Sequence, residues 1–462
     1  MRKAFAIIIT IIMVFAFVAC DAQNDFVGGD GESYDSTPSG IVGGDIFSAK
    51  GAARNRIFYP EGATGIAYDG GGELLFEGDD LDYRSIDEDD DVQAGQLTAK
   101  AWNDNEYYEE WLKLFAAKTD NDPEGKFYYY NTNTWPYDVS KRVKVTVTEG
   151  EKAVVGAEVT CFDSEQNSYT VITDVTGVAY LFPQTDTGSI TVKSGNGTGS
   201  DTFSAEKREL TVDLAESRSQ VNVIKMMFVI DATGSMGDEM RYIEAELADV
   251  VHRVTAQAQE VRIDLALLFY RDDGDQEKFA YHSFKNVTEE QGLLDQIDIL
   301  SKQRAEGGGD YPEAVDEALV LAAGKDWGEE NSTKLMFLVL DAPPHNIDTD
   351  RVNIKNAVTA AAAKGIRICP VLCSGADELC EYVTRMSAIV TGGTSVFVTD
   401  DSGIGGEHLD PDLPEATVER LNDLLVRLIV GYHTGDFGTP TAWNAGSDTQ
   451  QGQSGDPVPE AD

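Results

Sequence analysis

A regular alternation of apolar runs and amphipathic segments between Val221 and Tyr432 most constrains the fold. Long apolar runs indicate strands buried on both faces, and their alternation with helices predicts a mostly parallel, doubly wound α/β sheet. Ligands of such sheets bind beyond the carboxyl ends of the strands. We predict strands over 226–230, 261–269, 278–284, 334–340, 366–372 and 394–399, and helices over 238–256, 289–300, 312–323, 352–364, 378–389 and 416–430.

Two of these strands end in aspartate at the expected ligand edge. MMFVID ends at Asp231 and MFLVLD ends at Asp341. The first continues into ATGSM, which puts the hydroxyls of Thr233 and Ser235 on one tight turn with Asp231, before a helix. These hard oxygen donors suit a divalent cation, with Mg²⁺ the first choice and Mn²⁺ or Ca²⁺ as alternatives.

The segments FVIDATGSM, LFYRDDGD, GGGDYPEAVDEAL and FLVLDAPPH occur in this order. Together they resemble the von Willebrand factor A domain, in the hemicentin-like variant of its metal-ion-dependent adhesion site. The resemblance implies that Asp231, Thr233 and Ser235 form the first metal loop and that Asp341 belongs to the third. The second loop commonly has Thr where this chain has Asp310, and the hemicentin-like subset shares the GGGD-x-PE pattern. Asp310 is therefore a candidate ligand.

The Asp310 carboxylate would add negative charge to this site. The resemblance implies that the open position of the cation takes a carboxylate from a partner. Additional negative charge is expected to strengthen cation binding and to weaken capture of that carboxylate. The sequence thus favours a cation site that is partly structural.

Three other interpretations of the same residues are weaker. Ser235, Asp341 and His345 follow the Ser, Asp, His order of α/β-hydrolases, but the first Gly of G-x-S-x-G and an HGGG-like loop are missing. A haloacid dehalogenase-type phosphatase needs a second Asp where Thr233 stands. Asp231 could also cap the following helix without binding an ion. We therefore predict a protein that is not an enzyme.

The N-terminus predicts export. Arg2 and Lys3 precede an apolar run that is too short to span a bilayer and ends before Cys20. Residues 1–19 are therefore predicted to be a signal peptide. The sequence FVAC resembles the lipobox of bacterial lipoproteins, which implies lipidation of Cys20. Ordinary cleavage near Ala19, which would give a soluble secreted protein, is the alternative.

Charge and cysteine spacing argue against nucleic-acid binding and against a cysteine-based structural zinc site. The chain has 81 acidic and 36 basic side chains, so no basic surface is expected for nucleic acid. The acidic run from Asp87 to Asp91 lacks the Gly and Glu of an EF-hand loop and is predicted to be a solvated linker. The cysteines after Cys20 lack the paired C-x-x-C spacing of structural zinc sites. Cys373 and Cys380 are the only pair spaced for a local disulfide, and the sequence leaves open whether they are bridged.

The rest of the chain divides by composition. Residues 20–95 are predicted to be a tether and an acidic region, 96–139 a short helical region with Trp111 on its apolar face, and 433–462 a disordered tail. Residues 140–215 show short alternating runs that predict a small all-β sandwich. This segment resembles carboxypeptidase regulatory-like and collagen-adhesin B-type, Ig-like modules, which implies a spacer.

Together these features predict a lipid-anchored protein of the outer membrane or cell surface. Its A domain, over 220–432, is expected to bind a protein or glycan through a divalent cation. The alternative is an envelope assembly or scaffold subunit in which the metal site is largely structural.

Overall fold

The computed structural model of the protein describes residues 92–119, 123–133, 138–220, 222–257, 260–328, 331–411, 413 and 416–444. The predicted signal peptide, the lipidation of Cys20 and the acidic run from Asp87 to Asp91 lie outside these residues. In the part of the chain that is described, no helix is both long enough and apolar enough to cross a bilayer.

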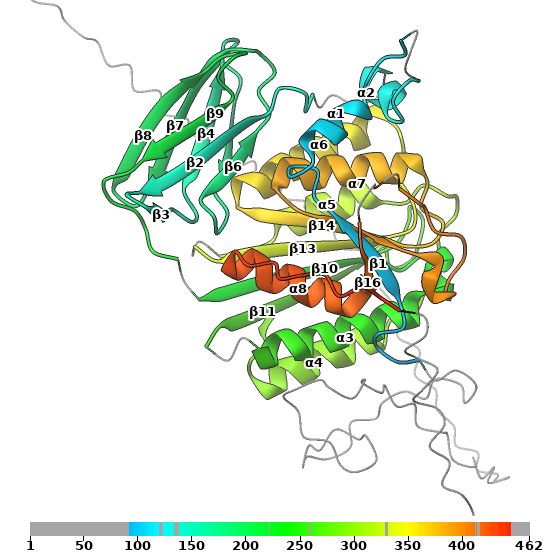
Figure 1. Ribbon diagram of the computed structural model, residues 1–462. Helices are drawn as coiled ribbons and strands as arrows, with labels where there is room; N and C mark the ends of the chain where they lie inside the picture. The colour runs from blue at the N-terminus through cyan, green and yellow to red at the C-terminus, as the bar shows by residue number, and fades with distance from the viewer. Residues whose placement is uncertain are drawn as a thin grey trace, which may run out of the picture. The chain divides into compact units, whose positions relative to one another are not determined.

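An eight-stranded mixed sheet has the order β12-β11-β10-β13-β14-β15-β1-β16 (Figure 1). Its central strands, from β11 to β15, pair in parallel. Strand β12 and the strands beyond β15 pair antiparallel. The predicted α/β class is confirmed. The strands are β1 (Thr98–Trp102), β10 (Val223–Asp231), β11 (Arg262–Tyr270), β12 (Phe279–Asn286), β13 (Thr333–Leu340), β14 (Ile366–Leu372), β15 (Ser395–Val398) and β16 (Val418–Arg420).

Helices cover both faces of this sheet. In β10, Phe228 packs in the core that contains α3, α4 and α8, and the adjacent Met227 packs in the core that contains α5, α6 and α7. Burial on both faces explains the continuous apolar runs. The helices are η1 (Gly234–Asp238), α3 (Met240–Gln257), α4 (Glu290–Ser301), α5 (Val315–Gly324), α6 (Asp348–Ala363), α7 (Glu378–Thr391), η2 (Asp400–Ser402) and α8 (Leu421–Thr434).

The region from 96 to 139 begins with a strand, which was not predicted, before its helical part. Its first part, β1, pairs antiparallel with both β15 and β16. Just before β1, the buried Glu246 carboxylate of α3 accepts hydrogen bonds from the amides of Gly95 and Leu97 at 2.8 and 2.9 Å. These contacts make the start of this region part of the large sheet. Two short helices follow, α1 (Tyr108–Lys113) and α2 (Tyr128–Asn133).

Trp111, on the predicted apolar helix face, is fully buried. It packs against Phe115 and Phe127, with ring centroids 4.8 and 6.0 Å apart. Phe127 in turn contacts Tyr382 of α7 at a centroid distance of 5.3 Å. The residues that precede the β-rich segment therefore belong to the core of the α/β sheet.

The β-rich segment folds into two four-stranded sheets. One has the order β3-β2-β6, with β9 paired to β2, and the other has the order β5-β4-β7-β8. Inward-facing residues of both sheets, such as Val145 and Val159, share one core. The assignment to an Ig-like sandwich family stays a prediction. The strands are β2 (Val143–Glu149), β3 (Lys152–Ala153), β4 (Glu158–Asp163), β5 (Ser168–Ile172), β6 (Val178–Leu181), β7 (Gly188–Ser194), β8 (Gly197–Phe203) and β9 (Glu209–Asp213).

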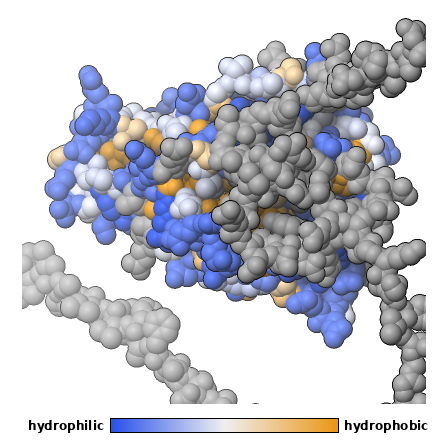
Figure 2. Space-filling view, turned by 90° about the horizontal axis from the view of Figure 1, so that it is seen from below, coloured by the Kyte–Doolittle hydropathy of each residue, from blue (hydrophilic) through white to orange (hydrophobic). Residues whose placement is uncertain are grey.

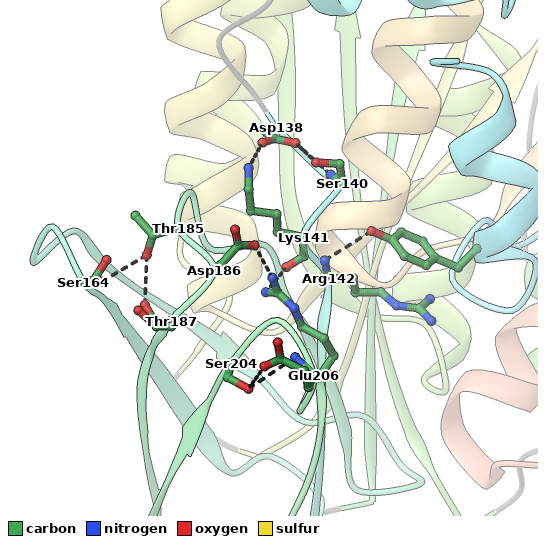
Figure 3. Close-up of polar contacts among 12 residues, drawn as sticks. Asp138, Ser140, Lys141, Arg142, Ser164, Thr185, Asp186, Thr187, Ser204 and Glu206 are labelled. Atoms are coloured by element: carbon green, nitrogen blue, oxygen red, sulfur yellow. Dashed lines mark hydrogen bonds and ion pairs between the residues drawn. The ribbon is translucent and has the colours of Figure 1, made fainter. Parts of the chain in front are cut away.

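Polar contacts fix the segment that leads into β2 (Figure 3). The Asp138 carboxylate accepts the Ser140 amide at 2.9 Å and pairs with Lys141. The Tyr108 hydroxyl accepts the Arg142 amide at 3.2 Å and donates to the Val139 carbonyl at 2.6 Å. These bonds connect α1 directly to the start of the first β-rich sheet.

The start of the tail and the state of the cysteines can also be described. The tail was predicted to be disordered from 433, but α8 continues to Thr434, and the amides of Trp443 and Thr441 bond to Val418 O and to Glu419 Oε2 at 2.7 and 3.1 Å. These two hydrogen bonds attach residues 441 and 443 to β16. The four described cysteines, including Cys373 and Cys380, are free thiols.

The described surface carries many hydrophilic side chains. Figure 2 shows hydrophilic side chains over much of the described surface on one face, with smaller hydrophobic areas between them.

Candidate metal centre

The first loop of the candidate site follows β10 directly. The Asp231 Oδ1 atom accepts hydrogen bonds from the amide and the hydroxyl of Thr233 at 2.9 and 2.7 Å. Thr233 Oγ1 lies 3.2 Å from Ser235 Oγ. Asp231 and Thr233 are fully buried and Ser235 is exposed. The turn therefore gathers one carboxylate and two hydroxyls, with Ser235 at the solvent side.

Backbone hydrogen bonds attach the second loop to the first and the third. The Gly234 amide donates to Gly307 O at 3.2 Å, and the Glu306 amide donates to Ala232 O at 3.0 Å. The Glu313 amide donates to Pro343 O at 2.9 Å, just beyond Asp341. The three loops therefore form one connected unit at the carboxyl ends of β10 and β13.

Glu313 is a functional candidate that the sequence analysis missed. Its side chain is 3% exposed, and its carboxylate interacts electrostatically with Asp231 and Asp341. Gly308 has φ +75°, and its missing side chain lets the second loop lie close to Thr233 of the first loop. A Cβ at this position would lie 3.2 Å from Glu313 Oε1 and 3.3 Å from Thr233 Cβ. Glu313 is in the same GGGDYPE motif as Asp310, so testing each carboxylate of that motif would have identified it.

Several buried oxygen atoms of this cluster lack a hydrogen bond. Among the described residues, Asp231 Oδ2, Asp341 Oδ1 and Glu313 Oε2 are buried without a partner. Unpaired buried carboxylates are costly, and they are normally neutralised by protons, by basic groups or by metal ions. The donor set therefore fits a divalent cation with hard oxygen ligands.

The electrostatics of these carboxyls agree with that interpretation. Burial, followed by the charges of Asp231 and Asp272, raises the pKa of Glu313 to about 9. Burial also raises the pKa values of Asp231 and Asp341. The negative charge of Asp272 adds to the effect at Asp231, and the negative charge of Asp231 adds to the effect at Asp341. A cation would remove this repulsion.

Asp310, the ligand predicted from the second loop, lies beside a different set of residues. Its side chain is 69% exposed, and its Oδ2 atom is 3.7 Å from His345 Nε2. Potential ligand atoms of Asp272, Asp310 and His345 all lie within 4.8 Å of one another. The second loop thus presents Glu313 to Asp231 and Asp310 to His345.

The hydrolase interpretation has little geometric support. The Ser235 hydroxyl is 3.2 Å from Thr233 Oγ1, whereas the His345 imidazole faces Asp310. The described residues show no hydrogen bond between His345 and Ser235. The base and nucleophile of a serine hydrolase need such contact.

The α/β part is similar to a known domain family. Residues 225–392 match the family model of the von Willebrand factor A domain. An ariadne-like RING finger protein of Acanthamoeba polyphaga mimivirus is 24% identical over 196 residues, which are 38% of this chain and 18% of that protein. The chain therefore spans less than a fifth of that relative.

Solved structures show weaker similarity. The pilus adhesin SpaC of Lactobacillus rhamnosus GG, in its open conformation, aligns with a TM-score of 0.32 and 9% identity over 53% of this chain and 31% of SpaC. BatB of Bacteroides thetaiotaomicron, a conserved hypothetical protein, aligns with a TM-score of 0.27 and 14% identity over 37% of this chain and 87% of BatB.

Proposed function

We propose that this protein binds a protein or glycan partner through a divalent cation held by its von Willebrand factor A domain. Asp231, Thr233, Ser235 and Asp341 are the proposed ligands, as the sequence indicates. Glu313 takes the role that the sequence analysis gave to Asp310, because its carboxylate is the one that lies against the first loop. Mg²⁺ is the first choice of cation, since every donor is a hard oxygen.

The observation that carries this proposal is the set of buried, unpartnered oxygens on Asp231, Asp341 and Glu313. A helix cap needs only one carboxylate, which accepts a backbone amide, so capping does not explain three buried carboxylates with unpartnered oxygens. A bound cation supplies the missing partner. It would also present a coordination position beside the exposed Ser235, where an oxygen of a partner could bind.

Calorimetric titration of the full chain with Mg²⁺ tests the ligand set. Glu313→Gln and Asp341→Asn are expected to weaken Mg²⁺ binding by roughly tenfold or more. The matched control is Asp310→Asn, which is expected to change the affinity less than twofold, roughly 0.4 kcal/mol. Equal losses in Asp310→Asn and Glu313→Gln would contradict the assignment of Glu313.

We further propose that the chain is exported and lipid-anchored at Cys20, at the outer membrane or cell surface, and that it is not an enzyme. Adhesion predicts Mg²⁺-dependent, EDTA-sensitive binding to immobilised foreign proteins or glycans, lost in Asp341→Asn. The alternative is a scaffold subunit with a largely structural cation. In that case the protein would co-purify with one envelope protein in an EDTA-sensitive manner and would bind no member of such a panel.

A further inference from the structure

We propose that Asp272, Asp310 and His345 form a second cation site, separate from the proposed Mg²⁺ site, and that this second site takes a divalent transition metal such as Zn²⁺. The three residues come from different loops at one sheet edge. Asp272 follows β11, Asp310 belongs to the loop before α5, and His345 follows β13. Their potential ligand atoms lie within 4.8 Å of one another.

Burial of the Asp272 side chain distinguishes this cluster from a group of exposed acidic residues. Asp272 is 2% exposed, and its Oδ1 atom is buried with no hydrogen-bond partner among the described residues. Its amide donates to Asp275 Oδ2 at 3.1 Å, and Asp275 Oδ2 also accepts the Gly308 amide at 2.9 Å. The backbone that carries Asp272 is therefore attached to the loop that carries Asp310, while a carboxylate oxygen of Asp272 stays available.

The spacing of the other two donors leaves room for an ion. His345 Nε2 and Asp310 Oδ2 are 3.7 Å apart, which is too long for a hydrogen bond. Two ligands of one Zn²⁺ ion, each about 2.0–2.2 Å from the metal, lie roughly that far apart. Asp310 is largely exposed, so the site is open to solvent and to exchange of the ion.

The chemistry of the donors distinguishes this site from the first. The first set contains carboxylates and hydroxyls, whereas the second adds an imidazole nitrogen. Imidazole favours Zn²⁺ and other transition metals over Mg²⁺ and Ca²⁺. Two carboxylates and one imidazole also leave at least one coordination position for water, as in open zinc sites.

The two sites are expected to influence each other. The negative charge of Asp272 raises the pKa values of both Asp231 and Glu313, so the clusters are electrostatically connected. A cation at the second site would reduce the repulsion at the first without sharing its ligands.

Competition between the full chain and a chromophoric chelator for Zn²⁺, in the presence of saturating Mg²⁺, tests this proposal. One equivalent of Zn²⁺ is expected to bind. His345→Gln and Asp272→Asn are expected to weaken it by roughly tenfold or more, with Mg²⁺ affinity changed much less. His282→Gln, a half-buried histidine in β12, is the matched control and should behave as wild type.

Co²⁺ provides a second measurement, because a histidine-containing site gives visible absorption bands that His345→Gln should abolish. Circular dichroism of each variant separates loss of the site from loss of the fold. Unchanged Zn²⁺ binding in His345→Gln would overturn the proposal. So would mutually exclusive binding of Zn²⁺ and Mg²⁺ with both lost in Asp341→Asn, since that result indicates one shared site.

Discussion

Arg385 of α7 donates two hydrogen bonds to the carboxylate of Asp104, at 2.6 and 3.0 Å, across 281 positions of sequence. Both side chains are almost fully buried, and Arg385 Nη1 also bonds to Glu381 at 2.8 Å. The guanidinium lies over the rings of Trp111 and Phe127. The residues before the β-rich segment are thus fixed to the α/β sheet by a buried charged network.

Removing one partner of this network should be strongly destabilising. Asp104→Ala is expected to lower the free energy of unfolding by about 3–5 kcal/mol, because Arg385 would keep a buried charge without its main partner. Denaturant unfolding checks this value. The control is Lys113→Ala in the exposed Lys113–Glu110 pair, expected to cost less than about 0.5 kcal/mol. Similar losses in the two variants would contradict a dominant role for burial.

The segment that carries β1 is expected to be required for folding. A chain that begins at Asp138 should be much less stable than one that begins at Val92, because it lacks β1 and the buried Trp111 and Phe127. Each such buried aromatic side chain contributes about 1.5–3 kcal/mol. Limited proteolysis and thermal unfolding of the two chains measure the difference. Equal melting temperatures would show that the α/β sheet does not need β1.

Neutralising a carboxylate of the proposed metal centre should have opposite effects on stability with and without cation. In EDTA, Asp341→Asn is expected to raise the free energy of unfolding by roughly 1 kcal/mol, because it removes a buried, repelled charge. With Mg²⁺ at a hundred times its Kd, the wild type should gain about 2.7 kcal/mol and the variant far less. Thermal unfolding in both buffers provides the test. Equal Mg²⁺ stabilisation of the two proteins would contradict a role for Asp341.

Gly308→Ala should weaken Mg²⁺ binding more than its backbone strain alone explains. The added Cβ would press on Glu313 Oε1 and Thr233 Cβ at 3.2 and 3.3 Å. Gly150→Ala is the matched control, because Gly150 also has a positive φ but has open space around it. Both variants should lose stability, whereas only Gly308→Ala should lose Mg²⁺ affinity in calorimetry. Unchanged affinity would show that the second loop does not need this close approach.

Because His252 is buried, the protein is expected to lose stability in acid. Burial lowers the pKa of this α3 histidine to about 4, so the unfolded chain binds its proton first as the pH falls. The contribution of His252 is fully present above about pH 6.5 and is lost between pH 6.5 and 4, up to about 3 kcal/mol. Unfolding of His252→Gln at pH 7.5 and 4.5 should therefore show a smaller decrease than the wild type. An equal decrease would indicate that other groups control acid unfolding.

Much of the α/β part follows from local sequence pattern. Each predicted strand and helix between 226 and 430 overlaps an observed element, because burial on one or both faces imposes a periodicity that the sequence itself displays. The first residues of the predicted last helix instead form β16, a strand of three residues. So short a strand has no periodicity to recognise.

Sequence alone determined that Asp231 and Asp341 lie at the carboxyl ends of two buried strands, because that result depends on apolar runs and on the rules of parallel sheets. Tertiary structure alone decided that β10 and β13 are neighbours, that β1 joins this sheet, that Asp104 pairs with Arg385, and that Glu313 rather than Asp310 lies against the loop after β10. These relationships join residues that are distant in sequence or that point in different directions from one loop. Such pairings cannot be predicted from local sequence, because they depend on the packing of the whole fold.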